Sequence, residues 1–176
     1  MTAVSFLGDV PTCGSSIYGW SSPVTNYVTS AWTGPTDTWQ DRPVKMVADS
    51  VATVDGKDVL VPVAWLLRHS DVFDVAEENA LDALNAMAAN GKRSVAECYA
   101  LGIDPEDEED DFKITAFEIV NGEPVFTLNH TEDGSGVSFE TRIRKLGKAN
   151  LGDEWVEVPV GGNPSFRFFK VMVEMP

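Results

Sequence analysis

Residue types that commonly carry chemistry are scarce in this chain. The 176 residues include only two histidines and two cysteines. Cys13 and Cys98 are far apart, and no CxxC or Cys/His spacing surrounds either one, so a structural zinc site is excluded by the lack of ligands. We favour two unlinked thiols, because buried free cysteines are common; a single disulfide is the alternative in an oxidising compartment.

Basic residues are also scarce. The 13 lysines and arginines face 28 acidic residues, which gives a net charge of -15 and a pI near 4.3. This charge repels phosphate backbones and anionic lipid surfaces, so we expect no nucleic-acid partner. No run of about 18 apolar residues exists, and the N-terminus lacks the basic and apolar regions of a signal peptide. We therefore expect no membrane insertion, and we expect any export signal to lie upstream of Met1 or to have been removed.

The sequence contains no recognisable catalytic motif. His69, Ser70 and Asp71 are adjacent, whereas the members of a catalytic triad must face one another across a site. The other histidine, His130, is expected at a strand end, and neither a GxSxG elbow nor a phosphate-binding loop is present. We therefore predict that the protein is not an enzyme. Paired carboxylates for glycoside hydrolysis are the alternative left open in so acidic a chain.

The spacing of apolar residues changes near the middle of the chain. Before residue 90 the pattern is helical, and beyond residue 112 it alternates as in strands. Helices are expected from Pro62, over 72–89 and over 94–101, the last ended by Gly102. Strands are expected at 2–7, 113–120, 124–129, 137–145, 154–158 and 166–174. The pattern predicts an α+β chain whose last five strands form a small antiparallel β-sandwich or a curled sheet covered by helices.

Three stretches near the N-terminus occur in a recognisable order. They are VSFLGDVP at 4–11, then Tyr27 with Val28, and then Trp39 followed by Arg42, Pro43 and Val44. This order resembles the last repeat and capping segment of BspA-like leucine-rich repeat proteins, although Asp41 stands where a glycine is more usual. The resemblance implies that further repeats of a solenoid precede this segment, because a lone repeat cannot bury its apolar face.

A second resemblance covers residues 60–176. It rests on Trp65, on the stretch 95–107 with its ECYALGIDP sequence, and on Trp155 with Phe166, Phe168 and Phe169. These features resemble a module found at the C-terminal ends of large bacterial surface proteins. The resemblance implies an extracellular or cell-surface location and a structural role at the chain terminus, without an activity.

Together these patterns divide the chain into four segments. Residues 1–47 are expected to form the terminal leucine-rich repeat and its cap, 48–60 a linker, 61–112 a helical segment with an acidic loop, and 113–176 an antiparallel β-module. We expect a non-catalytic structural or adhesion module of a secreted or cell-surface repeat protein. Its expected partners are the upstream repeats of the same chain and a host or glycan surface.

Carbohydrate binding is the first alternative function. The N-terminal segment is rich in aromatic residues, and Trp20, Trp32 and Trp39 are the candidate residues for stacking on sugar rings. The alternative requires at least one of these tryptophans to be exposed on a flat face, because exposed aromatics mark a site and buried ones form a core.

Calcium binding is the second alternative. Gly91 and Glu97 have the spacing of the turn glycine and the bidentate glutamate in an EF-hand loop, but the first and third ligand positions fall on Ala86 and Ala88. We interpret this loop as degenerate, held by side-chain packing of Tyr99 and Leu101 and by Asn90 or Gly91 in the turn, and we expect the fold not to depend on calcium.

The acidic run that follows is a separate candidate for calcium. Asp104, Asp107, Asp110 and Asp111 are the candidate ligands for a weakly bound ion. A solvated loop without a cofactor is the interpretation we favour, because runs of like charge usually face water.

Overall fold

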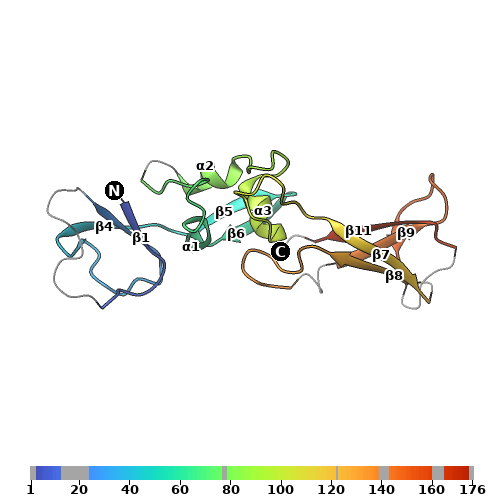
Figure 1. Cartoon of the computed structure of the whole chain (residues 1–176), viewed down its shortest axis with the longest axis horizontal. Coiled ribbons are helices and arrows are strands. Elements are labelled where there is room, and N and C mark those ends of the chain that lie inside the picture. The colour runs from blue at the N-terminus through green and yellow to red at the C-terminus, as the bar shows by residue number, and fades with distance from the viewer. Residues whose placement is uncertain are drawn as a thin grey trace. The chain divides into compact units, whose positions relative to one another are not determined.

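The computed structural model describes residues 3–12, 24–76, 79–121, 123–138, 143–159 and 165–174. The chain is an α+β protein with short helices and several small sheets (Figure 1). It divides into two compact units. We call Met1–Ala96 with Pro105–Glu108 the N-terminal unit, and Glu97–Asp104 with Glu109–Pro176 the C-terminal unit.

The helices and strands follow one another in three groups along the chain. The first group is β1 (Ala3–Phe6), β2 (Thr25–Val28), β3 (Thr38–Trp39) and β4 (Arg42–Met46). The second is β5 (Ser50–Val54), β6 (Lys57–Val61), α1 (Val63–Leu66), α2 (Ala80–Asn85) and α3 (Val95–Leu101). The third is β7 (Ile114–Val120), β8 (Glu123–Leu128), β9 (Ile143–Lys148), β10 (Val156–Glu157) and β11 (Phe168–Val173). None of the helices in the described part of the chain is long and apolar enough to cross a membrane.

The first sheet stacks successive turns of the chain in parallel. β1 pairs with β2 and β2 with β4, both in parallel, with Ala3 opposite Thr25 and Asn26 opposite Val44. The chain therefore advances by 22 and then 18 residues between neighbouring strands. β3 turns back antiparallel to β4, so the strand order is β1-β2-β4-β3 and β1 lies at the other edge. We call this arrangement the parallel coil.

Aromatic rings fill the inside of the parallel coil. Phe6, Trp32 and Trp39 form a triangle whose ring centroids lie 5.1 to 5.5 Å apart. They pack against Val28, which is completely buried. Phe6 lies on β1, whereas Trp32 and Trp39 both lie in the turn between β2 and β4, so the cluster ties two successive turns together by burying apolar surface.

Two buried polar side chains also connect the turns of the parallel coil. The Asn26 side chain is fully buried, and its Nδ2 donates a hydrogen bond to the carbonyl oxygen of Trp39 at 3.0 Å. Thr29 Oγ1 donates to the carbonyl oxygen of Leu7 at 3.5 Å. Because a buried polar group without a partner costs free energy, these contacts fix which backbone groups meet.

Residues 50–61, which fall largely within the expected linker, form the β5-β6 hairpin. Asp55 and Gly56 have φ angles of 50° and 77°, the two positive values that a tight two-residue hairpin turn requires. The buried residues alternate along both strands, with Ala52 opposite Val59. The hairpin thus has one apolar face and belongs to the core of the N-terminal unit.

The helix expected over 72–89 is only partly present. α2 covers six residues, with the Asn79 side chain accepting a hydrogen bond from Leu81 N–H at 2.9 Å. Upstream, the Asp74 carboxylate accepts from Ala76 N–H in a turn, and downstream Ala86 is already extended. Asp and Asn side chains compete with helical hydrogen bonds in this way, so the helical spacing of apolar residues was not enough to predict a long helix.

The expected helix over 94–101 is confirmed as α3. Gly102 follows it with a φ of 67°, and Ile103 N–H donates to the Cys98 carbonyl oxygen at 2.9 Å, which closes the C-terminal end. Cys98 is completely buried, and the expectation that the two cysteines are unlinked stays a prediction. Cys13 lies outside the described residues.

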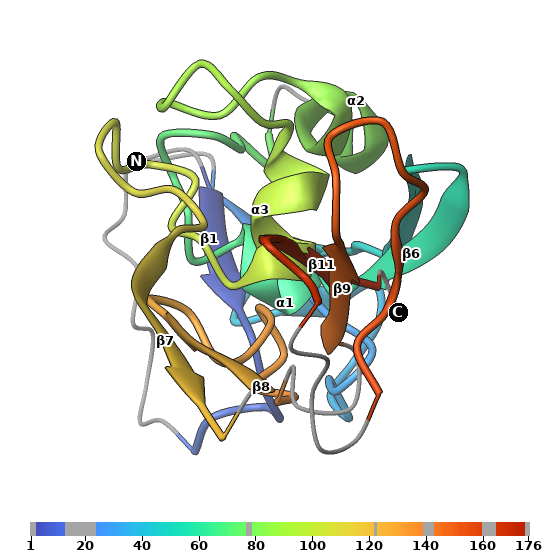
Figure 2. The same ribbon diagram turned by 90° about the vertical axis from the view of Figure 1, so that its right-hand side faces the viewer.

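The five strands expected beyond residue 112 are present, and they form two sheets. β7 and β8 make a hairpin, seen side by side in Figure 2, while β9 lies between β10 and β11 in an antiparallel sheet. β9 covers Ile143–Lys148 of the strand expected over 137–145, whose residues 139–142 lie outside the described part of the chain, and Ser138 makes an isolated bridge with Glu132. The small antiparallel sheets predicted from alternation are therefore confirmed.

Candidate functional site

The carboxylates of the acidic run are used locally. Asp110 Oδ2 accepts a hydrogen bond from Asp104 N–H at 2.9 Å, and its Oδ1 lies 2.7 Å from Nε2 of His130. Asp111 Oδ1 accepts from Phe112 N–H at 2.9 Å. Asp107 belongs to the N-terminal unit. Within residues 104–111, all of which are described, the four aspartates expected as calcium ligands do not gather into one ligand set.

Both carboxylate oxygens of Asp110 contact other residues of the chain. Partial burial raises its pKa, but the hydrogen bonds from Asp104 N–H and from His130, with the charge of His130, outweigh this effect, and the net pKa is lowered. A carboxyl whose pKa is lower in the folded state stabilises the fold above its unfolded pKa of about 3.9, and this stabilisation is lost as the pH falls through the folded pKa.

We expect Asp110→Asn to reduce the acid sensitivity of the C-terminal unit. Asparagine can accept the Asp104 hydrogen bond but gains no stability from ionisation. In urea unfolding, the free energy of unfolding should therefore fall less between pH 7 and pH 3 for the variant than for the unchanged protein. Glu118→Gln, at an exposed position of β7, is the control. Equal losses in the unchanged protein and Asp110→Asn would contradict this role.

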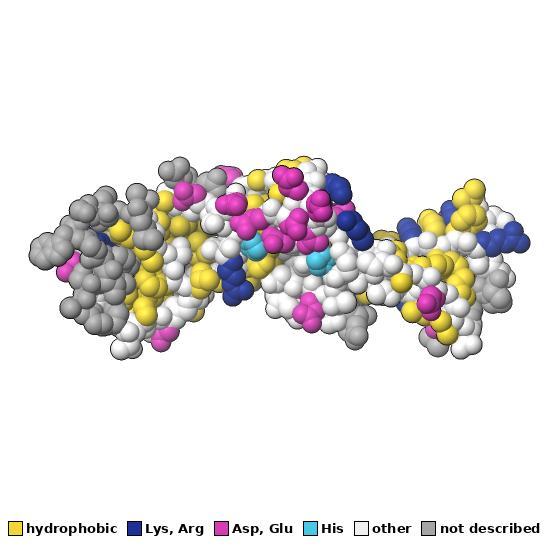
Figure 3. Space-filling model, in the orientation of Figure 1, with side chains coloured by type: hydrophobic (Ala, Val, Ile, Leu, Met, Phe, Trp, Pro, Cys, Tyr) yellow, Lys and Arg dark blue, Asp and Glu magenta, His cyan; other side chains and the backbone are white. Residues whose placement is uncertain are grey.

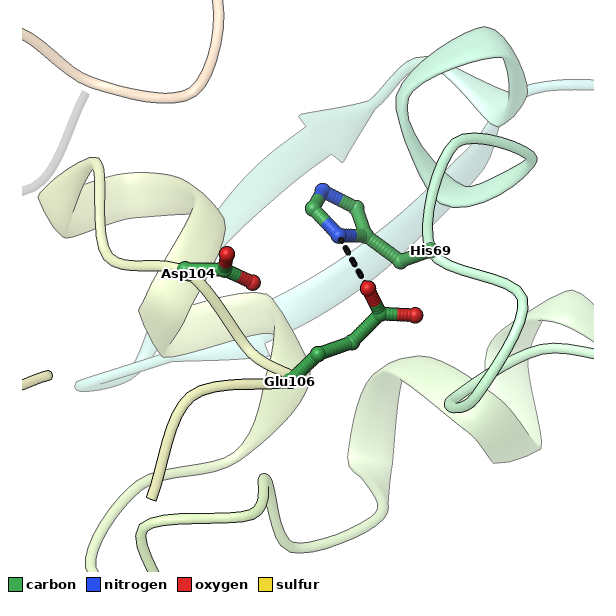
Figure 4. A group of neighbouring side chains, drawn as sticks. All are labelled: His69, Asp104 and Glu106. Atoms are coloured by element: carbon green, nitrogen blue, oxygen red, sulfur yellow. Dashed lines mark ion pairs between the residues drawn. The ribbon is translucent and has the colours of Figure 1, made fainter. Parts of the chain in front are cut away.

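His69 occupies a structural position in the N-terminal unit. Its Nδ1 lies 3.6 Å from Oε2 of Glu106, and the other carboxylate oxygen of Glu106 accepts from Asp71 N–H at 2.8 Å (Figure 4). The imidazole also packs on Trp65 with ring centroids 4.6 Å apart. Asp104, also drawn in Figure 4, is a residue of the C-terminal unit. Glu106 thus connects the turn after α1 to residues 105–108, and its hydrogen bond from Asp71 joins residues 35 apart, a contact that sequence spacing did not predict.

Hydrogen bonds within the EF-hand-like loop close it. Asn90 Oδ1 accepts hydrogen bonds from Lys92 and Arg93 N–H, and Gly91 has a φ of 65°. Val95 N–H donates to the Ala86 carbonyl oxygen at 3.0 Å. The interpretation that Asn90 and Gly91 hold the turn is therefore confirmed.

The tryptophans expected as sugar platforms are in the core. Trp32 is 6% exposed and Trp39 is 8% exposed, and both belong to a core cluster with Val28. Neither presents a flat face to a ligand, so the prediction that these two residues stack on sugar rings is wrong. Burying the rings between turns of the parallel coil is more favourable than leaving them in water. Trp20 lies outside the described residues.

A cavity of about 450 Å³ in the C-terminal unit was not anticipated from the sequence. Five aromatic side chains line it: Phe117, Phe126, Trp155, Phe168 and Phe169. The ring of Phe117 lies 5.2 Å from that of Phe126 and 5.8 Å from that of Phe169, so the cavity brings the hairpin and β11 together.

A β-bulge shapes the hairpin side of this cavity. The β7-β8 register shifts between Ile114 and Ala116, so that Ile114 pairs with Leu128 while Phe117 pairs with Phe126. Paired residues lie on the same face of a sheet, and Leu128 and Phe126 are two apart on one strand. The bulge therefore places Ile114 and Phe117, three residues apart, on one face.

Two basic residues complete the lining. Lys148 Nζ lies 4.6 Å from the centre of the Trp155 ring and donates to the Leu151 carbonyl oxygen at 2.6 Å. Arg167 is held opposite Lys148 by a backbone hydrogen bond of 3.0 Å. Figure 3 shows apolar side chains (yellow) together with basic side chains (dark blue) on the strands of this unit.

Sequence reasoning singled out Trp155, Phe168 and Phe169 as aromatic residues but not as a site. Their clustering in sequence was the available signal. The contribution of Phe117 and Ile114 was hidden, because neither the bulge nor the pairing of distant segments can be read from spacing. Comparison of the chain with models of protein families, with curated proteins and with solved structures found no match.

Proposed function

We propose that the N-terminal unit closes the end of a parallel-strand solenoid, and that the chain is a non-catalytic structural or adhesion module of a secreted or cell-surface leucine-rich repeat protein of the BspA-like type. The parallel register is the observation that carries this proposal. Steps of 22 and 18 residues between neighbouring strands are close to the period of about 20 to 29 residues in leucine-rich repeats.

The two edges of the first sheet differ as the two sides of a terminal repeat should. At one edge, β3 runs antiparallel to β4, so a further parallel turn cannot stack there. At the other edge, β1 is in register to pair with a preceding parallel strand. Its neighbour β2 buries Asn26 and Val28, which pair with Val4 and Phe6, so the inward face of β1 continues the apolar column.

An exposed edge strand promotes association between copies, so the protein is expected to self-associate through β1. Ser5 is exposed on β1, and a lysine there adds charge to the edge without entering the core. In sedimentation velocity, we expect concentration-dependent dimers or larger species, and we expect Ser5→Lys to shift them to monomer.

Thr53→Lys, at an exposed position of the β5-β6 hairpin, is the matched control and should leave association unchanged. A protein that stays monomeric at high concentration, or an equal response to both substitutions, would count against β1 as a stacking edge.

A further inference from the structure

We propose that the aromatic cavity of the C-terminal unit is a binding site for a small amphipathic anion, a flat apolar group that carries a carboxylate. The site is separate from the parallel coil, and the proposal does not depend on the proposed function of that coil. It rests on the size of the cavity, its apolar lining and the sign of the charges placed in it.

The size and lining of the cavity suit a small organic group. Its volume of about 450 Å³ falls within the range of about 300 to 1,000 Å³ typical of ligand pockets. Ile114 and Phe117 are 48% and 47% exposed, and Trp155 is 37% exposed, so apolar surface at this cavity is open to water. A flat apolar group that covers these side chains would remove that surface from water, which favours binding.

The charges at the cavity are opposite in sign to the charge of the chain. Acidic residues outnumber basic ones 28 to 13, yet the charged side chains among the described lining residues are Lys148 and Arg167. A third cation, Lys170, lies 5.0 Å from the centre of the Trp155 ring. Three cations around one aromatic cavity in so acidic a chain favour an anionic ligand.

The cations are also arranged to receive a carboxylate. One donor of the Lys148 ammonium goes to Leu151, which fixes the group and leaves two donors. No described residue pairs with the guanidinium of Arg167, whose planar fork can donate two parallel hydrogen bonds to a carboxylate. Both side chains line the same cavity, so a carboxylate there would meet donors from β9 and from the residue that precedes β11.

A neutral sugar fits this cavity less well. Among the described lining residues no side chain is a carboxylate, a carboxamide or a hydroxyl, and these are the groups that usually hydrogen-bond sugar hydroxyls. The lining therefore favours a ligand that carries both a negative charge and an apolar group.

Isothermal titration of the full chain with three matched probes tests the proposal. The probes are 2-naphthoate, its neutral carboxamide and the cationic 2-naphthylmethylammonium. We expect the carboxylate to bind about tenfold more tightly than the carboxamide, and the ammonium compound not to bind. Equal affinities for all three, or no binding of the carboxylate, would overturn the proposal.

Substitutions place the binding at this cavity. Arg167→Gln should weaken carboxylate binding about tenfold while leaving carboxamide binding unchanged, and Lys148→Gln is a second, independent variant with the same expected split. Lys145→Gln removes the same charge from an exposed position of β9 outside the lining and should change neither affinity. An equal effect of Lys145→Gln, or dimers that bury the cavity and exclude the probes, would overturn the proposal.

Discussion

Gly102→Ala is expected to destabilise the C-terminal unit by about 2 to 5 kcal/mol. Gly102 has a φ of 67°, a region that costs an L-residue about 1 to 2 kcal/mol. A Cβ at this position would also collide with the backbone carbonyl oxygen of Glu132, and such overpacking costs about 1 to 3 kcal/mol. Urea unfolding followed by circular dichroism would measure the loss.

Gly136→Ala is the matched control in the same unit. Gly136 has a φ of 82°, but its added Cβ would meet only the Glu132 carboxylate at 3.9 Å, an ordinary contact. It should cost only the backbone strain, about 1 to 2 kcal/mol. If both variants lose the same free energy of unfolding, the close packing of the 132–136 turn on the end of α3 is not present in solution.

Trp39→Ala is expected to have the second large effect, a loss of about 3 to 5 kcal/mol in the stability of the N-terminal unit. The substitution leaves a cavity between Phe6 and Trp32, which the neighbouring turns cannot fill without moving their strands. The Trp39 carbonyl oxygen that accepts from Asn26 is retained, so the substitution leaves this backbone hydrogen bond in place. Hydrogen exchange of amides in β1, β2 and β4 would show the effect residue by residue.

Trp155→Ala provides the comparison. Trp155 is 37% exposed in the other unit, so its removal should leave exchange in the parallel coil unchanged. A Trp39→Ala protein that exchanges like the unchanged chain would show that the aromatic triangle does not hold the coil.

Local signals in the sequence predicted the elements that depend on local chemistry. Gly102 marked the end of α3, and alternation located β7, β8 and β11. The α+β class and the small antiparallel sheets follow from these elements. α2 was overestimated because Asn79 caps a new helix in the middle of a continuous apolar pattern.

Features that depend on distant contacts were not predictable from residue spacing. The aromatic-rich segment around Trp32 and Trp39 is typical of a sugar-binding surface as well as of a core. Only the pairing of β1, β2 and β4 places the two rings inside a core. The aromatic cavity needs the register shift after Ile114 and the approach of β11, and the Asp110–His130 contact joins residues 20 apart. The sequence contains the residues in each case, but not the geometry that brings them together.

The capping of a solenoid by the parallel coil is tested most directly by transplanting the coil. Residues 3–47 joined to a designed leucine-rich repeat array without its own C-terminal cap, with β1 continuing the parallel register, should give a monomeric protein in sedimentation velocity. The same fusion with Trp39→Ala is the control and should associate as the uncapped array does. A fusion that associates like the uncapped array, although the attached segment is folded, would contradict the proposed role.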